Sequence, residues 1–201
     1  MRKRASPALD VHPLTPGRWA DLVTLFSGRG GSQVRGCWCM YYRFSGHVAR
    51  PPGVTPADHN RQSLKSLVDR GTVPGLIGYR DGKPIAWVSL APRDQYAKLA
   101  KSTVMKPVDD KPTWSIVCFY TAQDARGEGV AATMLASALA YARDNGARLV
   151  EAYPIDKDGR GRDDSMWFGT KPMYDRAGFC EVARRKPARP VVRKVLRPAS
   201  R

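Results

Sequence analysis

The chain lacks any apolar run near the roughly 20 residues that a membrane-spanning helix needs. Its first residues, MRKRASPALDVHP, also lack the apolar centre of a secretory signal peptide. Four cysteines are present among 201 residues, but none forms a C-x-x-C pair or stands near histidines at zinc-ligand spacing. We therefore expect a cytoplasmic protein with reduced thiols, no membrane contact and no bound metal. The Cys37-Trp38-Cys39 triplet leaves a redox or metal-binding pair open as a less specific alternative.

Acidic residues are also few, since 18 of them face 34 lysines and arginines, and the formal net charge is +16. The excess is concentrated at the two ends, at residues 2–4 and 184–201. We expect one domain over residues 14–196, with a basic tail at 1–13 and a second tail at 197–201. Basic ends can bind nucleic acid. No aromatic interleaving or known binding motif accompanies them here, so solvated tails are the simpler interpretation.

Apolar periodicity and turn residues divide the domain into elements. Helices are predicted at 19–26 and 60–70, from 129 to about 145, and from about 172 to 177. Strands are predicted at 36–43, 115–121, 149–153, 180–184 and 190–196, with a hairpin over 74–92. Residues 93–112 are expected to form a surface connection, and 154–164 a flexible loop whose aspartates do not follow the calcium-binding pattern. The order predicts a mixed α/β sheet flanked by helices.

Residues 113–151 form the centre of this plan, as a strand, a glycine-rich turn, a helix and a second strand. The turn contains Gly127 and Gly129, which let a backbone approach a ligand closely. A helix that begins at Gly129 directs unpaired N–H groups and its positive dipole end into the turn. Together with Arg126, this pattern predicts a pyrophosphate-binding site.

Two motifs resemble the GNAT superfamily of acyl-CoA-dependent N-acetyltransferases. The segment RGEGVA at 126–131 matches the family's R/Q-x-x-G-x-G/A signature, and MYDRAGF at 173–179 resembles its later Y-x-x-x-G-F segment. The resemblance covers roughly residues 75–180. It implies a mixed, mostly antiparallel central sheet, acetyl-CoA as co-substrate, and a variable acceptor-binding part at 14–70.

The resemblance also implies roles for individual residues. Main-chain groups of Phe119 and Thr121 are expected to contact the pantetheine arm. The pyrophosphate is expected at Arg126, Gly127, Gly129, Val130 and Ala131. Tyr174 matches the tyrosine that protonates the departing coenzyme A thiolate in many members, and the alternative for it is a core tyrosine of the last helix.

The first strand of the central stretch lacks the acidic residue that the family often uses as general base. Residues 113–121 contain no aspartate or glutamate. Glu151 on the following strand is the nearest candidate for the base, either directly or through a water molecule. Its alternatives are a structural pairing with a basic neighbour and proton loss to a water chain.

The acceptor is expected to be a primary amine, and the aromatic residues Trp38, Tyr41 and Tyr42 are candidates for its pocket wall. The same segment is equally consistent with a core strand. We expect a small molecule, such as a metabolite or an aminoglycoside-like antibiotic whose positive charge the loop aspartates could meet. A protein or aminoacyl-tRNA amine is the alternative. The sequence leaves open whether the protein is a monomer or a homodimer.

Two other classes of protein compete with this interpretation. Gly127, Gly129 and Ala132, followed by Glu151, also fit a dinucleotide-binding fingerprint. However, residues 122–126 separate the turn from its strand, and too little chain follows for a second nucleotide-binding half. The other competitor is a catalytically silent module of the same fold that binds coenzyme A or nucleic acid.

Overall fold

The computed structural model describes residues 8–46, 48–156 and 167–198, and its centre is a seven-stranded sheet in the order β1-β2-β3-β4-β5-β7-β6. The strands are β1 (Asp10–Pro13), β2 (Gly75–Arg80), β3 (Lys83–Pro92), β4 (Trp114–Thr121), β5 (Leu149–Ala152), β6 (Cys180–Arg184) and β7 (Pro190–Val195). Neighbouring strands are antiparallel except β4 and β5, which run parallel. The predicted mixed, mostly antiparallel sheet is confirmed.

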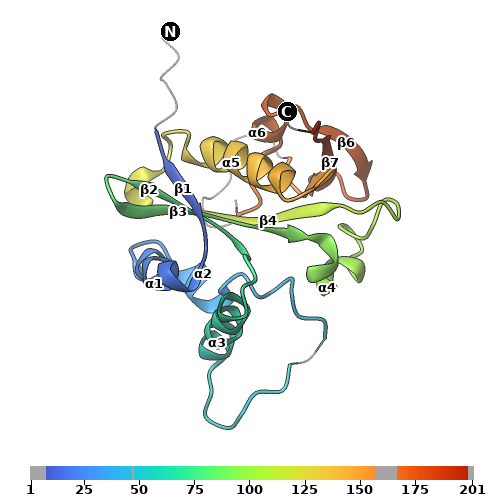
Figure 1. Ribbon diagram of the computed structural model, residues 1–201. Helices are drawn as coiled ribbons and strands as arrows, with labels where there is room; N and C mark the ends of the chain where they lie inside the picture. Colours follow the sequence, from blue (N-terminus) through green and yellow to red (C-terminus); the bar gives the residue numbers. More distant parts are fainter. Residues whose placement is uncertain (1–7, 47, 157–166, 199–201) are drawn as a thin grey trace.

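Helices cover both faces of this sheet (Figure 1). They are α1 (Trp19–Ser27), α2 (Ser32–Cys37), α3 (Pro56–Asp69), α4 (Ala97–Ala100), α5 (Val130–Asp144) and α6 (Lys171–Arg176), with short 3-10 turns η1 (Pro16–Arg18), η2 (Arg93–Gln95) and η3 (Gln123–Ala125). In Figure 1, α5 and α6 lie above the sheet, and α1 to α4 lie below it. Because both faces are covered, β4 is a continuous run of buried residues from 115 to 120 and does not alternate.

The most regular sequence patterns correspond to observed elements. Helix α5 has apolar residues at every fourth position, 130, 134, 138 and 142, and these lie on its buried face. Asp81 and Gly82 join β2 to β3 with φ angles of 49° and 74°. Positive φ at both central residues gives the mirror-image turn that matches the twist of a hairpin. The predicted helix and hairpin are therefore confirmed.

The strand predicted at 36–43 is wrong. Residues 32–37 form α2, and Trp38 and Cys39 follow with φ angles of 46° and 52°, in the left-handed region. The Trp38 ring is buried against Trp19 and Phe26, with centroids 5.8 and 5.3 Å away. A short run of apolar residues such as 37–42 does not distinguish strand from helix by periodicity.

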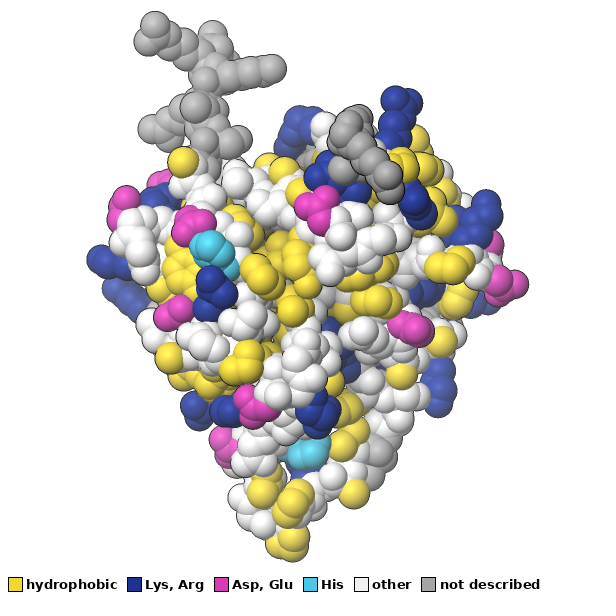
Figure 2. All heavy atoms as spheres, viewed as in Figure 1, with side chains coloured by type: hydrophobic (Ala, Val, Ile, Leu, Met, Phe, Trp, Pro, Cys, Tyr) yellow, Lys and Arg dark blue, Asp and Glu magenta, His cyan; other side chains and the backbone are white. Residues whose placement is uncertain are grey.

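Part of the predicted N-terminal tail belongs to the sheet. Residues 10–13 form β1, which pairs with β2 and was missed in the sequence. In the β6–β7 hairpin, Arg184 lies 2.6 Å from carboxylate oxygens of both Asp156 and Glu181. On the face in Figure 2, Lys and Arg side chains are spread around the edge of the molecule and do not form one patch. The positive charge of Arg184, the first basic residue of the C-terminal stretch, is thus paired within the fold.

Strands β4 and β5 separate partway along their length. Their pairing covers residues 114–116 against 150–152, whereas β4 continues beside β3 to Thr121. The register with β3 shifts between Ser89 and Leu90, so that Val117 is an extra residue in β4. Such a bulge bends a strand and is common beside active sites. The separation leaves space for another segment along the second half of β4.

Candidate active site

The glycine-rich turn connects the end of β4 to α5. Gly127 and Gly129 have φ angles of 80° and 85°, and a Cβ built on either would meet no atom within 4 Å. The positive φ favours glycine, and the open space lets a ligand approach the backbone. Gly129 is the N-cap of a 15-residue helix and makes no side-chain capping bond. The first N–H groups of a helix have no acceptor within it, so this turn fits an anionic group.

Arg126 is fixed beside this turn. Its Nε donates to the carbonyl of Thr121 at 3.1 Å. A Cβ built on Gly30 would lie 3.0 Å from Arg126 Nη2, so the glycine cluster after α1 approaches the same guanidinium. Of the two residues that follow Gly129, Val130 is buried and Ala131 is half-buried. The structure thus brings the predicted pyrophosphate residues together, and adds the loop at 28–31, which the sequence did not connect to them.

Residues 167–168 lie beside the part of β4 that follows Ile116, which β5 does not pair with. The backbone N–H of Phe119 donates to the Trp167 carbonyl at 2.6 Å. The hydroxyl of Tyr174, from α6, donates to the Phe168 carbonyl at 2.9 Å. The rings of Phe119 and Tyr174 contact each other edge to face, with centroids 6.5 Å apart. Phe119, which the resemblance assigns to the pantetheine arm, and Tyr174, which it assigns to the departing thiolate, are therefore neighbours, and their donors bond to consecutive carbonyl groups.

Tyr174 is fully buried. Burial raises the pKa of its phenol well above the usual value, and the nearby Cys118 and Tyr153 act in the same direction. The hydroxyl therefore keeps its proton at neutral pH. A group in this state can act as a general acid if a leaving group reaches it.

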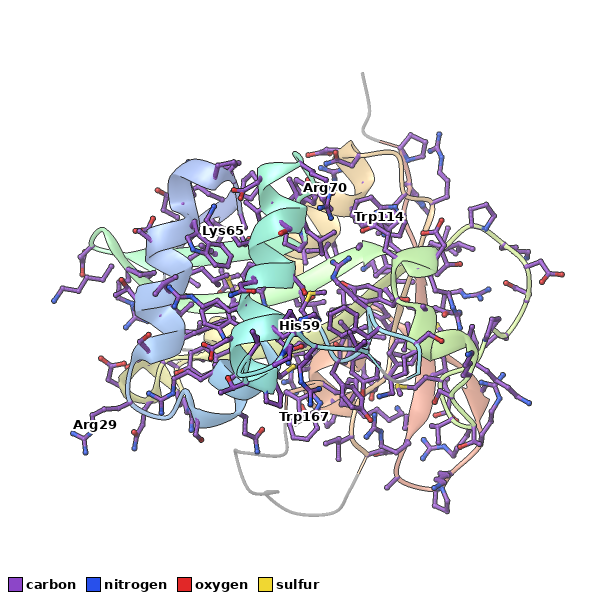
Figure 3. The ribbon with its side chains drawn as sticks, turned by 90° about the horizontal axis from the view of Figure 1, so that it is seen from below. Arg29, His59, Lys65, Arg70, Trp114 and Trp167 are labelled. Carbon is purple, nitrogen blue, oxygen red and sulfur yellow. The ribbon has the colours of Figure 1, made fainter. Side chains whose placement is uncertain are left out.

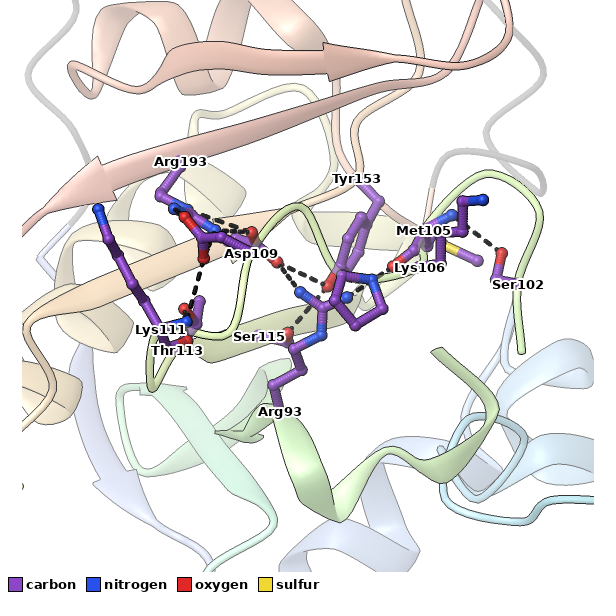
Figure 4. Close-up of polar contacts among 12 residues, drawn as sticks. Arg93, Ser102, Met105, Lys106, Asp109, Lys111, Thr113, Ser115, Tyr153 and Arg193 are labelled. Atoms are coloured by element: carbon purple, nitrogen blue, oxygen red, sulfur yellow. Dashed lines mark hydrogen bonds and ion pairs between the residues drawn. The ribbon is translucent and has the colours of Figure 1, made fainter. Parts of the chain in front are cut away.

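A buried polar network contains Arg93, Tyr153 and Arg193 (Figure 4), and all three donate to Glu151. Its Oε1 accepts from Arg193 Nη2 at 2.6 Å, and its Oε2 accepts from Arg93 Nη1. The hydroxyl of Tyr153 donates to Oε2 at 3.4 Å and shares a second hydrogen bond of 2.9 Å with Ser115 Oγ. Both carboxylate oxygens therefore have guanidinium donors, and the pairing of Glu151 with basic neighbours is observed.

The network also corrects the prediction for residues 93–112. This segment is not only a surface connection, because it contributes Arg93 and the buried side chains of Tyr96 and Leu99. Asp109 lies 2.7 Å from Arg193 Nη1. The hydrogen bond from Arg193 lowers the pKa of Asp109 to about 2. The segment thus joins β3 to β7 through the ion pairs around Glu151.

The three aromatic residues predicted to line an acceptor pocket have different environments. Trp38 lies in the core below the sheet. Tyr42 is half-buried and packs against Phe168, with ring centroids 5.7 Å apart. Tyr41 is 54% exposed and contacts Tyr42 at 4.9 Å. The structure therefore connects Tyr42 directly, and Tyr41 through Tyr42, to the segment beside β4.

Sequence reasoning missed several residues of this region: Arg93, Ser115, Tyr153, Phe168, Arg189 and Arg193. The sequence could have indicated one of them, Tyr153. It is two residues from Glu151 in a predicted strand, and side chains at that spacing lie on the same face of a sheet. The loop aspartates at 158, 163 and 164 lie outside the described residues, and Asp156 pairs with Arg184.

A groove of about 790 Å³ continues from the first turn of α5 along α6 and β7. Ala132, Leu135 and Met173 supply apolar lining, and Arg143, Arg176 and Lys194 supply positive charge.

None of the helices in the described part of the chain combines the length and apolar character required to cross a bilayer.

Comparison with protein-family models shows which family the chain belongs to. Residues 42–161, more than half of the chain, match the model of the Acetyltransferase (GNAT) family. The protein therefore belongs to the GNAT acetyltransferase family. No curated protein sequence matches the chain significantly.

Solved structures share the fold at low sequence identity. A GNAT-family acetyltransferase from Streptococcus agalactiae has a TM-score of 0.55 and 11% identity, covering 94% of this chain and 96% of that one. A polyamine N-acetyltransferase from Drosophila melanogaster has a TM-score of 0.52 and 14% identity, covering 94% and 100%. A ribosomal-protein-alanine N-acetyltransferase from Brucella melitensis has a TM-score of 0.52 and 16% identity, with the same coverage. At these identities the similarity concerns the fold.

Proposed function

We propose that the protein transfers an acetyl group from acetyl-CoA to a primary amine of a small molecule. The observation that carries this proposal is the convergence of the Phe119 N–H and the Tyr174 hydroxyl beside the glycine-rich turn. The turn would hold the pyrophosphate through its backbone N–H groups and Arg126. The pantetheine arm would follow the free part of β4, from Thr121 towards Phe119.

The proposed reaction is a direct transfer. The amine nitrogen adds to the thioester carbon while the Phe119 N–H donates to the carbonyl oxygen, which gains negative charge. When the carbon–sulfur bond breaks, Tyr174 gives its proton to the departing sulfur and the amine loses one proton to water, from which the tyrosinate of Tyr174 then regains a proton. Placing both substrates in one site supplies the proximity that the uncatalysed reaction lacks.

Acetyl-CoA must compete with the protein's own carbonyls for these donors. The N–H of Phe119 and the hydroxyl of Tyr174 are bonded to residues 167 and 168. Binding would exchange these two hydrogen bonds for bonds to the thioester, which requires the two peptide groups to move.

Glu151 as the general base remains a prediction. One of its oxygens would have to leave an arginine partner before it could accept a proton from the amine. The carboxylate is also fully buried. We propose that Glu151 mainly holds β5 to β7 and to the segment after β3, and that water accepts the proton.

The test is acetyl transfer by the full chain, with the acetylated amine and free coenzyme A measured by chromatography and mass spectrometry. A thiol reagent is unsuitable, because Cys180 is exposed and would react with it. The panel should contain small amines, peptides and an aminoacyl-tRNA, since related folds include polyamine and protein N-acetyltransferases. Absence of transfer to every acceptor, with salt-sensitive binding of RNA or DNA, would support the silent binding module.

A further inference from the structure

A continuous series of aromatic contacts leads from Tyr174 to the surface. The Tyr174 hydroxyl binds the carbonyl of Phe168, whose ring packs against Tyr42. The Tyr42 ring contacts Tyr41, which is 54% exposed. Phe168 and Tyr42 belong to the core on the side of the sheet that α1 to α4 cover, whereas Tyr174 belongs to the core under α5; Figure 3 views the molecule from the side of α1 to α4. An amine that reaches the thioester from this side would lie against these rings.

Cations lie against two rings of the series, those of Phe168 and Tyr41. The guanidinium carbon of Arg189 lies 4.2 Å from the centroid of the Phe168 ring. Lys98 Nζ lies 3.4 Å from the centroid of the Tyr41 ring. Arg43, next to Tyr42 in the chain, lies over Tyr96 at 4.7 Å. These contacts come from the β6–β7 turn, from α4 and from the segment after α2.

Arg189 differs from the neighbouring arginines in its partners. Arg184 and Arg193 each pair with two carboxylates. Within residues 8–46, 48–156 and 167–198, Arg189 forms no ion pair; its Nη2 donates to the Tyr153 carbonyl at 3.4 Å and to the sulfur of Met105 at 3.9 Å. Among the residues that the structure describes, its Nε is buried without a hydrogen-bond partner, as are Nε and Nη2 of Arg43. Burial lowers the pKa of Arg189.

A partly desolvated guanidinium with an unpaired N–H donor is a favourable binding partner for an anion. A cation–π contact with Phe168 orients the group, but it does not satisfy the buried Nε–H. A carboxylate or phosphate would satisfy it and pair with the charge, since the planar guanidinium presents donors in a fork that matches both. A polycationic acceptor would instead meet like charges at Arg189, Arg43 and Lys98.

We propose that the acceptor is a primary amine that also carries an anionic group, a carboxylate or a phosphate, and that Arg189 binds this group. This proposal rests on the proposed acetyl transfer. It makes an aminoglycoside-like antibiotic a poor substrate. It also assigns specificity to the β6–β7 turn together with Tyr42, and so to segments outside the coenzyme-binding core.

The test uses matched acceptors with the full chain and acetyl-CoA. Phenylalanine is compared with phenylalanine amide and phenethylamine, and O-phosphoethanolamine with ethanolamine, so that carboxylate and phosphate are tested separately. We expect an anionic member to exceed its neutral partner in kcat/KM by roughly 10- to 100-fold, the range for a charge-assisted pair. In Arg189→Gln this preference should disappear, and Arg189→Lys should restore part of it.

Arg70→Gln is the matched control, because it removes an exposed guanidinium from the end of α3 opposite to Trp167 in the view of Figure 3. It should leave the preference unchanged. Equal kcat/KM within each pair, or a preference that persists in Arg189→Gln, would overturn the proposal.

A second measurement does not need turnover. In the complex with coenzyme A, the Arg189 Nε–H resonance can be assigned by its absence from the spectrum of Arg189→Gln. It should shift when the anionic amines are added and not when their neutral partners are. If no anionic member shifts it, the proposal is wrong, even if neutral amines are acetylated. If acetyl-CoA itself does not bind by calorimetry, the proposed function fails instead.

Discussion

The backbone amide of Phe119 and the hydroxyl of Tyr174 donate to two consecutive carbonyl groups, at 2.6 and 2.9 Å. The two residues are far apart in the chain, on β4 and α6. Their donors meet because β4 loses its pairing with β5 after Ile116 and a different segment takes that place. The same two donors, turned to a thioester, would stabilise the oxygen and protonate the sulfur.

Tyr174→Phe should lower kcat by roughly 10²- to 10⁴-fold, the usual contribution of a general acid. The affinity for acetyl-CoA should change little, because the proton is needed only as the sulfur departs. Since burial raises the pKa of Tyr174, the wild-type enzyme should show no fall in kcat from this group as pH rises to about 10. Steady-state kinetics between pH 6 and 10, with calorimetry of acetyl-CoA binding, check both points. An unchanged kcat would remove Tyr174 from the mechanism.

Gly129 and Gly146 allow a matched comparison at the two ends of α5. Both have a φ of 85°, and a Cβ on either would meet no atom within 4 Å. Replacing each with alanine should therefore cost a similar free energy of unfolding, about 1–2 kcal/mol for a left-handed residue. Gly129→Asp should abolish acetyl-CoA binding, because it places negative charge at the helix N-terminus where a phosphate belongs. Normal calorimetric affinity in Gly129→Asp would show that the turn is not the pyrophosphate site.

Local patterns in the sequence predicted the parts of the fold that depend on local chemistry. The hairpin at Asp81-Gly82 and the buried face of α5 follow from turn preference and helical period. The turn at Gly127–Gly129 could also be placed, because its glycines stand directly before the periodic residues of the helix. The prediction of a strand at 36–43 failed because residues 37–42 are a continuous apolar run without a clear period, so that tertiary packing decides which of them are buried.

The buried network could not be predicted, because its contacts join distant positions. Arg93 and Glu151 are 58 residues apart, and Arg193 and Glu151 are 42 apart. Nothing in the local sequence selects these partners from the other basic residues. The position of residues 167–168 against β4 likewise depends on where β4 and β5 separate, which is a property of the assembled sheet.

Asp109 should contribute to stability in a defined pH window. Its pKa falls from an ordinary 3.8 to about 2, chiefly through the hydrogen bond from Arg193. A depressed folded pKa means that the contribution is fully present above the ordinary value and is lost as pH falls from about 4 through 2. Asp109→Asn should therefore unfold at lower denaturant concentration than wild type at pH 7, and the difference should shrink below pH 4. A constant difference across this range would contradict the ion pair.

The four thiols should differ in their reactivity. Cys180 is exposed, whereas Cys39 and Cys118 are buried. Hydrogen bonding to neighbouring thiols raises the pKa of Cys37 and Cys39, so their reactive thiolate forms are disfavoured. Alkylation of the native protein at pH 8, followed by peptide mass spectrometry, should modify Cys180 first and the other three only after unfolding. Rapid modification of Cys37 or Cys39 would instead support the redox-pair interpretation.

Glu151→Gln should strongly reduce stability. The change removes the carboxylate charge shared by two largely buried arginines, and breaking such a pair costs about 3–5 kcal/mol. Glu181→Gln is the matched control, because Glu181 pairs with Arg184 at the surface, with side-chain exposures of 32% and 33%. It should cost at most about 1 kcal/mol. Denaturant unfolding of both variants measures the contrast.

The same variant separates a structural Glu151 from a catalytic one. If Glu151 holds the strands together, kcat of the folded fraction at low temperature should remain close to wild type, with an unchanged pH profile. If it is the base, kcat should fall and the acidic limb of the pH profile should disappear. Stability and the pH profile are measured independently. A base that also anchors the fold would lower both stability and kcat and would remove the acidic limb, whereas a purely structural residue would lower stability alone.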